Sequence, residues 1–148
     1  MTIRKNRGSE ADQTAFLTIL AISDTHELHR EIDVPRGDLL IHAGDFTMFS
    51  KSAAAILDFN DWLGELPHRW KVCVPGNHEF FLEAHPSRRR LISNATLLIN
   101  KGIEVVGLKI WVADGLFGSQ KLKPIFWIWV CEYSLTVTLV ILLTASAP

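Results

Sequence analysis

The sequence predicts an α/β fold, because three short apolar runs of the kind found in buried parallel strands are combined with one amphipathic helix. The runs lie at 16–24, 38–45 and 70–79, and each ends in polar residues. The helical pattern lies between the second and the third run. Two more strand patterns follow at close spacing, at 96–100 and 103–111. We therefore expect an α/β sandwich with a mixed sheet rather than a purely doubly wound fold.

The helix is expected over 52–66, where apolar residues recur at helical spacing. They are Ala55, Ile56, Phe59, Trp62, Leu63 and Leu66. Ser50 or Ser52 can cap its N-terminus, and Pro67 ends it. A short basic helix is expected from Ser87 to Ser93. The strands at 96–100 and 103–111 are expected to pair antiparallel around Lys101-Gly102, with Gly107 interrupting the second.

The composition fits one globular domain whose charges are balanced. The 148 residues are 48% hydrophobic, and 15 basic against 16 acidic residues give a formal charge of -1. Nothing in this balance indicates binding to a nucleic-acid polymer. Cys73 and Cys131 stand far apart without CxxC spacing, which disfavours a disulfide framework and favours a reducing compartment, the cytoplasm. Residues 1–14 lack the apolar region of a secretory signal and are expected to form a flexible arm.

The C-terminal part, 112–148, forms an atypical apolar tail. Its stretch 125–147 contains one charge, Glu132, and is long enough to span a bilayer. Lys121 and Lys123 just before it would then keep the preceding domain in the cytoplasm, on a protein anchored in the membrane by this tail. The β-branched run VTLVI suits a buried strand equally well. A third alternative is a translated intron or faulty gene model that begins at Val112.

Three polar clusters stand where the first three predicted strands end. They are Asp24-Thr25-His26, Gly44-Asp45 and Gly76-Asn77-His78-Glu79. In open α/β sheets ligands bind at the carboxyl ends of the strands, so side chains from these clusters can converge on one crevice. Carboxylate, imidazole and amide together make a ligand set suited to Mn, Fe, Zn or Ni.

This residue set also fits hydrolysis of a phosphoester. A carboxylate such as Asp45 can bridge two cations, and Asn77 adds a neutral oxygen donor. Two metals about 4 Å apart can clamp a phosphate and supply a metal-activated hydroxide near neutral pH. His78 could protonate the departing oxygen. Glu79 either orients a neighbouring ligand or is a solvated turn carboxylate, and His42 is either a core residue or a support for a ligand. We expect His29 and His68 to be structural or surface residues.

The order and spacing of these motifs resemble the signature of the calcineurin-like metallophosphoesterase superfamily. The stretches ISDTHELH, GDLLIHAGDFT, FNDWLGELPH and PGNHE resemble its metallophosphoesterase-domain-containing branch of small phosphodiesterases, over about 17–111. The resemblance implies a four-layer αββα sandwich and a dinuclear centre of divalent metal ions. It implies that Asp24 and His26 bind the first metal, Asp45 bridges both, Asn77 binds the second, and His78 is catalytic. The implied substrate is a small phosphoester, with nucleotides among the candidates.

The sequence departs from the family pattern downstream. The family's later ligands are histidines well beyond the Asn-His motif, but no histidine follows His85, which lies too close to that motif to replace them. The second metal would keep only Asp45 and Asn77. We therefore expect a partial domain over 15–111, truncated at its C-terminus. Phosphodiester hydrolysis is the first hypothesis for its function, and a non-catalytic fragment with weak metal or nucleotide binding is the alternative.

Overall fold

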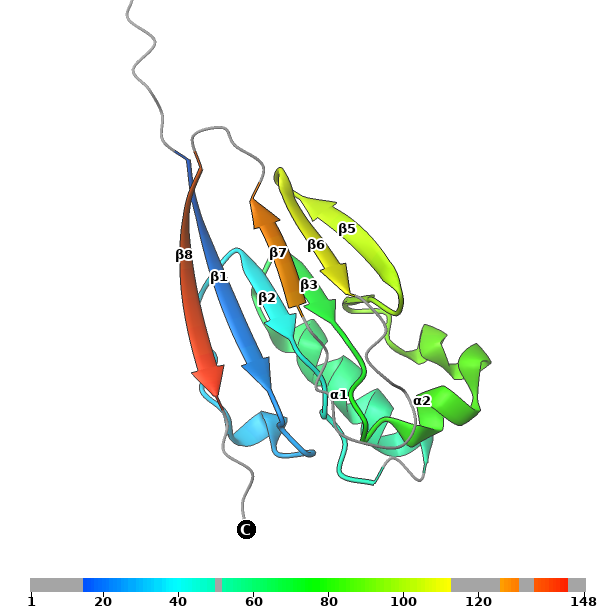
Figure 1. Ribbon diagram of the computed structural model, residues 1–148. Helices are drawn as coiled ribbons and strands as arrows, with labels where there is room; N and C mark the ends of the chain where they lie inside the picture. Colours follow the sequence, from blue (N-terminus) through cyan, green and yellow to red (C-terminus); the bar gives the residue numbers. More distant parts are fainter. Residues whose placement is uncertain (1–14, 50–51, 113–125, 131–134, 144–148) are drawn as a thin grey trace, which may run out of the picture.

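The computed structural model describes residues 15–49, 52–112, 126–130 and 135–143. They form two sheets that lie face to face, with the helices on the outer face of the first sheet (Figure 1). The first sheet has the strand order β4-β3-β2-β1-β8, and the second has the order β5-β6-β7. An α/β architecture, as the sequence predicts, is therefore confirmed.

The first sheet is parallel throughout. Its strands are β1 (Ala15–Ser23), β2 (Leu39–His42), β3 (Trp70–Cys73), β4 (Thr96–Leu97) and β8 (Leu135–Leu143). Each neighbouring pair runs in the same direction, with Ile22 opposite His42 and His42 opposite Cys73. The carboxyl ends of β1, β2 and β3 therefore lie side by side, which brings the three polar clusters to one edge of the sheet.

Helix α1 (Ala53–Glu65) covers one face of this sheet. The Ser52 hydroxyl caps it by accepting a hydrogen bond of 3.3 Å from the backbone N–H of Ala54. Leu66 is extended, as expected for a residue that precedes proline. The apolar face of the helix buries Ile56 and Phe59 against strand residues, and each such side chain contributes about 1.5–3 kcal/mol of transfer free energy.

Three short helical segments complete the helical face. They are η1 (His29–Glu31), α2 (Phe80–Ala84) and η2 (Pro86–Leu91). The sequence did not predict the first two. The basic helix expected from Ser87 to Ser93 is a 3-10 helix that begins one residue earlier, with Pro86 in its first turn, a position that proline suits because its φ is already helical.

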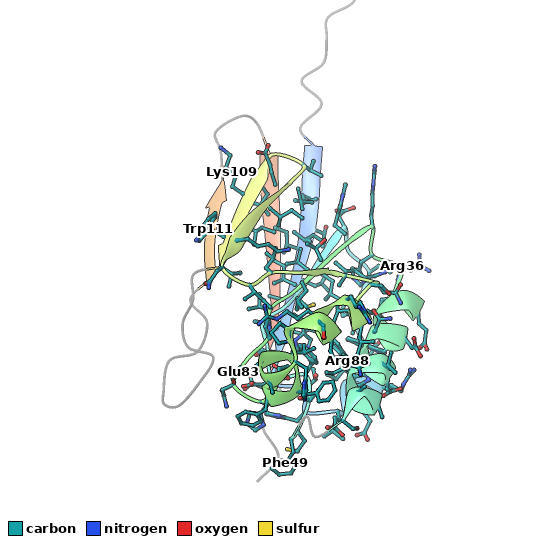
Figure 2. All side chains as sticks on the ribbon, turned by 90° about the vertical axis from the view of Figure 1, so that its right-hand side faces the viewer. Arg36, Phe49, Glu83, Arg88, Lys109 and Trp111 are labelled. Atoms are coloured by element: carbon teal, nitrogen blue, oxygen red, sulfur yellow. The ribbon has the colours of Figure 1, made fainter. Side chains whose placement is uncertain are left out.

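The second sheet is antiparallel and consists of β5 (Lys101–Val105), β6 (Leu108–Val112) and β7 (Phe126–Val130). Strand β6 alternates between buried and exposed residues. Leu108, Ile110 and Val112 pack against the parallel sheet, whereas Lys109 and Trp111 point outward (Figure 2). This sheet buries the face of β1, β2 and β3 that the helices leave open.

Two sequence predictions about the strands are wrong. The described strands do not form a mixed sheet, because one sheet is wholly parallel and the other wholly antiparallel. The segment 96–100 does not pair with 103–111, because Thr96 and Leu97 add to the edge of β3 instead. The segment 103–111 itself contains a hairpin turn at Val106-Gly107, where both residues have positive φ (49° and 78°), as a two-residue hairpin requires.

The two ends of the chain are described only in part. Residues 1–14 lie outside the described residues, so the flexible arm stays a prediction, as do the boundaries of the partial domain and the tail. Within the tail, Leu135–Leu143 forms β8, which pairs in register with β1 and agrees with the strand alternative for that segment. No helix within the described ranges is both long enough and apolar enough to cross a membrane.

Candidate metal centre

The site is built from three loops that follow β1, β2 and β3, and the loop after β2 lies at its centre. The backbone N–H groups of Asp24 and His26 each donate a 3.0 Å hydrogen bond to the carbonyl groups of Gly44 and Asp45, respectively. These bonds continue the pairing of β1 and β2 beyond the ends of the strands. Asp24, His26 and Asp45 all have positive φ (55°, 44° and 56°), so each loop turns sharply where its polar side chain emerges.

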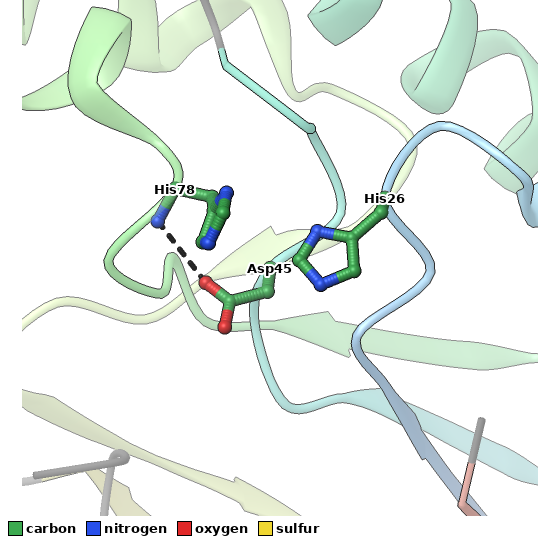
Figure 3. Close-up of side chains that lie close together, drawn as sticks. All are labelled: His26, Asp45 and His78. Atoms are coloured by element: carbon green, nitrogen blue, oxygen red, sulfur yellow. Dashed lines mark hydrogen bonds between the residues drawn. The ribbon is translucent and has the colours of Figure 1, made fainter. Parts of the chain in front are cut away.

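His26, Asp45 and His78 come together in this site (Figure 3). Their potential ligand atoms all lie within 4.8 Å of one another. The His78 backbone N–H donates a 3.1 Å hydrogen bond to Asp45 Oδ1, and the two imidazole rings meet edge to face with centroids 4.7 Å apart. Two imidazoles and a carboxylate form a mixed nitrogen and oxygen donor set, which suits Mn, Fe, Zn or Ni better than the thiolate-preferring metals.

The tautomers of both histidines follow from their partners. His26 Nδ1 lies 3.2 Å from the Thr47 carbonyl oxygen, and His78 Nδ1 contacts the Met48 carbonyl oxygen. A carbonyl oxygen can only accept a hydrogen bond, so each Nδ1 carries the proton. In a neutral ring the lone pair is then on Nε2, the nitrogen that can bind a metal or accept a proton.

The other two predicted ligands are not part of this three-residue group. Asp24 directly follows β1 and lies close enough to the buried His42 for its charge to oppose, in small part, the burial that lowers the pKa of His42. Asn77 is exposed in the turn after β3. Their roles as metal ligands stay predictions, as does the assignment of a purely catalytic role to His78, which the geometry places beside His26 and Asp45.

Glu79 is fully buried beneath the loops, which excludes the solvated turn carboxylate that the sequence left open. Its Oε2 accepts hydrogen bonds from the backbone N–H groups of Asp45 (3.0 Å) and Gly76, and its Oε1 accepts from the N–H (2.9 Å) and hydroxyl (3.0 Å) of Thr47. The pKa of the Glu79 carboxyl is raised to about 7, because the effect of burial exceeds the opposing effect of the hydrogen bonds from Thr47 and Gly76.

His42 is a buried support of the site. The Gly44 N–H donates to His42 Nδ1 (3.3 Å), so Nε2 carries the proton and donates to the Thr25 hydroxyl (3.1 Å). Burial lowers the pKa of His42 to about 3, which keeps the ring neutral. The ring also packs edge to face on Phe59, with centroids 5.0 Å apart. His42 therefore links the helix-facing core to the loops after β1 and β2.

His29 and His68 are buried structural residues, in agreement with one of the two readings of the sequence. His29 Nε2 bonds Asp58 (3.0 Å) and His68 Nε2 bonds the Pro35 carbonyl oxygen (3.0 Å). The carbonyl groups of Thr47 and Met48, which orient the two site histidines, had no signal in the sequence because every residue carries a backbone carbonyl.

Comparisons with known proteins place the chain in a family. The model of the calcineurin-like phosphoesterase family matches residues 17–136. Two relatives from Caenorhabditis elegans, the UPF0046 proteins K07C11.7 and C25E10.12, are 36% and 39% identical over 112 residues, which are 66% and 64% of this chain and 38% and 40% of theirs. The human metallophosphoesterase domain-containing protein 1 is 44% identical over 64 residues, 43% of this chain and 19% of its own length.

The chain thus spans about two fifths of the length of the worm relatives that it matches. The family match covers most of the chain and includes all three polar clusters. The expected resemblance is therefore confirmed, and the chain belongs to the calcineurin-like phosphoesterase family.

Proposed function

We propose that this protein hydrolyses phosphoesters, and phosphodiesters in particular, with divalent metal ions as cofactors. The observation that supports this most is the convergence of His26, Asp45 and His78 at the carboxyl ends of parallel strands, in a family of phosphoesterases. The donor set fits a metal ion because the neutral His26 ring has its lone pair on Nε2 and Asp45 supplies an anionic oxygen.

In this proposal Asp24, His26, Asp45 and Asn77 hold the metal ions. When bound, the metal ions would neutralise the phosphate charge and lower the pKa of a water molecule. The chain holds its ligands in place through backbone bonds: the Asp45 carbonyl binds the His26 N–H, and Asp45 Oδ1 binds the His78 N–H. The loops are thus arranged before any substrate arrives.

His78 is the proposed catalytic residue. The Met48 carbonyl fixes its ring by binding Nδ1–H, which leaves Nε2 to take up a proton and pass it to the departing oxygen. His78 is only partly buried, so this nitrogen can reach a substrate. His78 could instead bind a metal ion directly, and the variants described below separate a catalytic His78 from a metal-binding one.

The second candidate function is weak binding of one metal or of a nucleotide without catalysis. It is favoured by the small number of ligands. Within the described part of the chain, one group of acidic, histidine or cysteine residues is close enough to hold an ion, and it has three members: His26, Asp45 and His78. A centre with three such ligands can bind an ion without completing the two-metal arrangement that clamps a phosphate.

The test is manganese-dependent hydrolysis of a chromogenic aryl phosphodiester by the full chain. Asp45→Ala and His78→Ala should each lower kcat/KM by about 100-fold or more. The exposed residues Asp61 and His85 offer matched controls, since Asp61→Ala and His85→Ala remove the same groups away from the site. If His78 is catalytic, His78→Ala keeps the manganese affinity of the wild type. Equal activity in all five proteins would rule out the enzymatic proposal.

A further inference from the structure

Glu79 connects two of the three loops that make the site, and its carboxylate accepts four hydrogen bonds from them. Its partners come from the loop after β2 (Asp45 and Thr47) and from the turn after β3 (Gly76). All four donors reach one carboxylate that is 0% exposed. A buried carboxylate that receives four donors fixes the distance between the two loops. If either loop moved away, a carboxylate oxygen of Glu79 and the donors on that loop would lose their hydrogen-bond partners.

Asp45 is held directly by this carboxylate. Its backbone has a positive φ of 56°, a conformation that costs a residue with a side chain free energy unless its surroundings hold it. The Glu79 carboxylate binds the N–H of this same residue. The carboxylate of Asp45 then faces the His78 N–H, so its orientation depends on the conformation that Glu79 holds.

The turn after β3 approaches Asp45 very closely at Gly76, and the hydrogen bonds to Glu79 hold the two segments together there. A Cβ at Gly76 would lie 2.2 Å from Asp45 Oδ1 and 2.7 Å from the Asp45 nitrogen. Glu79 accepts from the Gly76 N–H and the Asp45 N–H with one oxygen, Oε2, and so brings the two backbones together. His78 lies next to Glu79 in the chain and enters the site at the same point.

We infer that Glu79 is a positioning residue for the metal centre: its buried carboxylate clamps the loop after β2 to the turn after β3, and thereby sets the geometry in which His26, Asp45 and His78 converge. Glu79 does not itself touch the metal or the substrate in this role. Thr47 shares it, because its hydroxyl and N–H bind the clamp while its carbonyl orients the His26 ring. The inference rests on the proposed function only in assuming that the group binds a metal ion.

Glu79→Gln tests the clamp with almost no change of volume. The NH2 group of glutamine cannot accept a hydrogen bond. Whichever way the amide turns, this group faces either the N–H groups of Asp45 and Gly76 or the N–H and hydroxyl of Thr47, so one of the two pairs of hydrogen bonds is disrupted. Glu104→Gln is the matched control, since Glu104 is exposed on β5 and the substitution makes the same change of side chain away from the site. We expect Glu79→Gln to weaken binding of Mn²⁺ by about 10- to 100-fold, the usual effect of losing a partner that supports a ligand, and Glu104→Gln to leave it unchanged.

Two readouts separate positioning from mere loss of fold. Titration with Mn²⁺, followed by electron paramagnetic resonance, reports affinity in the folded protein, and excess Mn²⁺ should restore kcat in Glu79→Gln. Amide hydrogen exchange in the metal-free protein should speed up at Asp45, Thr47 and Gly76 by tenfold or more, with β6 amides unchanged. A folded Glu79→Gln protein with wild-type Mn²⁺ affinity and wild-type exchange at these three amides would overturn the inference.

A second variant covers the case in which Glu79→Gln does not fold. Thr47→Val keeps the shape of the side chain and removes the hydroxyl that contacts both Glu79 Oε1 (3.0 Å) and the His78 carbonyl oxygen (3.1 Å), so Mn²⁺ affinity should fall several-fold. Unchanged affinity and exchange in Thr47→Val would then refute the clamp. A wild-type chain that binds no Mn²⁺ would instead defeat the proposed function, while the exchange rates would still decide whether Glu79 holds the loops together.

Discussion

The loops after β1 and β2 and the hairpin turn between β5 and β6 both use left-handed backbone conformations, but they differ in what holds those conformations. After β1 and β2 the chain enters left-handed conformations at Asp24, His26, Glu27 and Asp45, and each turn is held by bonds to another loop or to Glu79. Between β5 and β6 the chain reverses at Val106-Gly107, where a Cβ on Gly107 would meet nothing within 4 Å. Strain is therefore locked into the candidate site, whereas in the hairpin it serves only to turn the chain.

The two regions also differ in their surroundings, since the site loops pack on an aromatic core and the hairpin sheet has one face exposed to solvent. The site loops rest on a core in which Phe46 and Phe59 stack with ring centroids 4.2 Å apart, and His42 packs on the same ring. The outer face of the hairpin sheet carries exposed residues such as Trp111 (55% exposed). Perturbing the first region should therefore change metal binding and stability together, whereas perturbing the second should change stability alone.

The largest effect is expected from Phe59→Ala. Phe59 is fully buried and touches Phe46, His42 and Trp62, so its loss leaves a cavity directly under the site loops. The free energy of unfolding should fall by about 3–5 kcal/mol, as measured by urea denaturation. Leu57→Ala on the same helix, where the side chain is 43% exposed, is the control and should cost far less. Similar losses in both variants would contradict the core that we describe.

Gly76→Ala should follow in size, and it should also affect the metal centre. The added methyl group would overlap Asp45, whose backbone and side chain are both held in place, so the loops must separate. We expect a loss of up to about 3 kcal/mol in the free energy of unfolding, together with at least tenfold weaker Mn²⁺ binding.

The matched change in the hairpin is Gly107→Ala. A methyl group there meets open space, so only the positive φ resists it, at about 1 kcal/mol. Calorimetric titration with Mn²⁺ should give the wild-type affinity. Weaker Mn²⁺ binding in Gly107→Ala, or wild-type binding in Gly76→Ala, would remove the distinction between the two regions.

Acid should weaken the site region through His42. Its pKa is about 3 in the folded protein, below the ordinary value of about 6.5, so the unfolded chain takes up a proton first as the pH falls. The stability that neutral His42 contributes is complete above about pH 6.5 and is lost as the pH falls toward about 3, at about 1.4 kcal/mol per pH unit. By pH 5 this amounts to about 2 kcal/mol.

His42→Asn checks this pH dependence, because the asparagine oxygen can accept from the Gly44 N–H without titrating. Urea denaturation of metal-free protein at pH 7, 6, 5 and 4 should show a shallower decline of stability in the variant than in the wild type. Parallel curves for the two proteins would mean that His42 does not cause the loss.

The smallest effect is a gain, expected from Val106→Asn. A β-branched residue at φ of 49° is strained, and Asn-Gly is the preferred pair for a two-residue hairpin turn. The free energy of unfolding should rise by about 1 kcal/mol, seen as a higher midpoint in thermal denaturation, with hydrolysis and Mn²⁺ affinity unchanged. A destabilised variant would show that the turn is held by contacts other than its own backbone geometry.

The sequence alone predicted the α/β class, helix α1 with Ser50 or Ser52 as its cap, and the three clusters at strand ends. These features are local: apolar periodicity marks α1, and polar residues directly after an apolar run mark the end of a strand. The family resemblance followed from the same motifs. The pairing of β4 with β3 was missed because it depends on partners that are distant in the sequence. The hairpin at Val106-Gly107 was missed because valine replaces the Asn or Asp that usually marks a two-residue turn.

Only the tertiary structure decided which residues meet. The sequence determined that Asp24, His26, Asp45, Asn77 and His78 stand at strand ends, since that follows from the order of residues along each strand. It left Glu79 between two roles, and the fold resolved them by burying this carboxylate among four donors from two loops. Burial and hydrogen bonding between separate loops are properties of the packed chain, and no spacing within one motif encodes them.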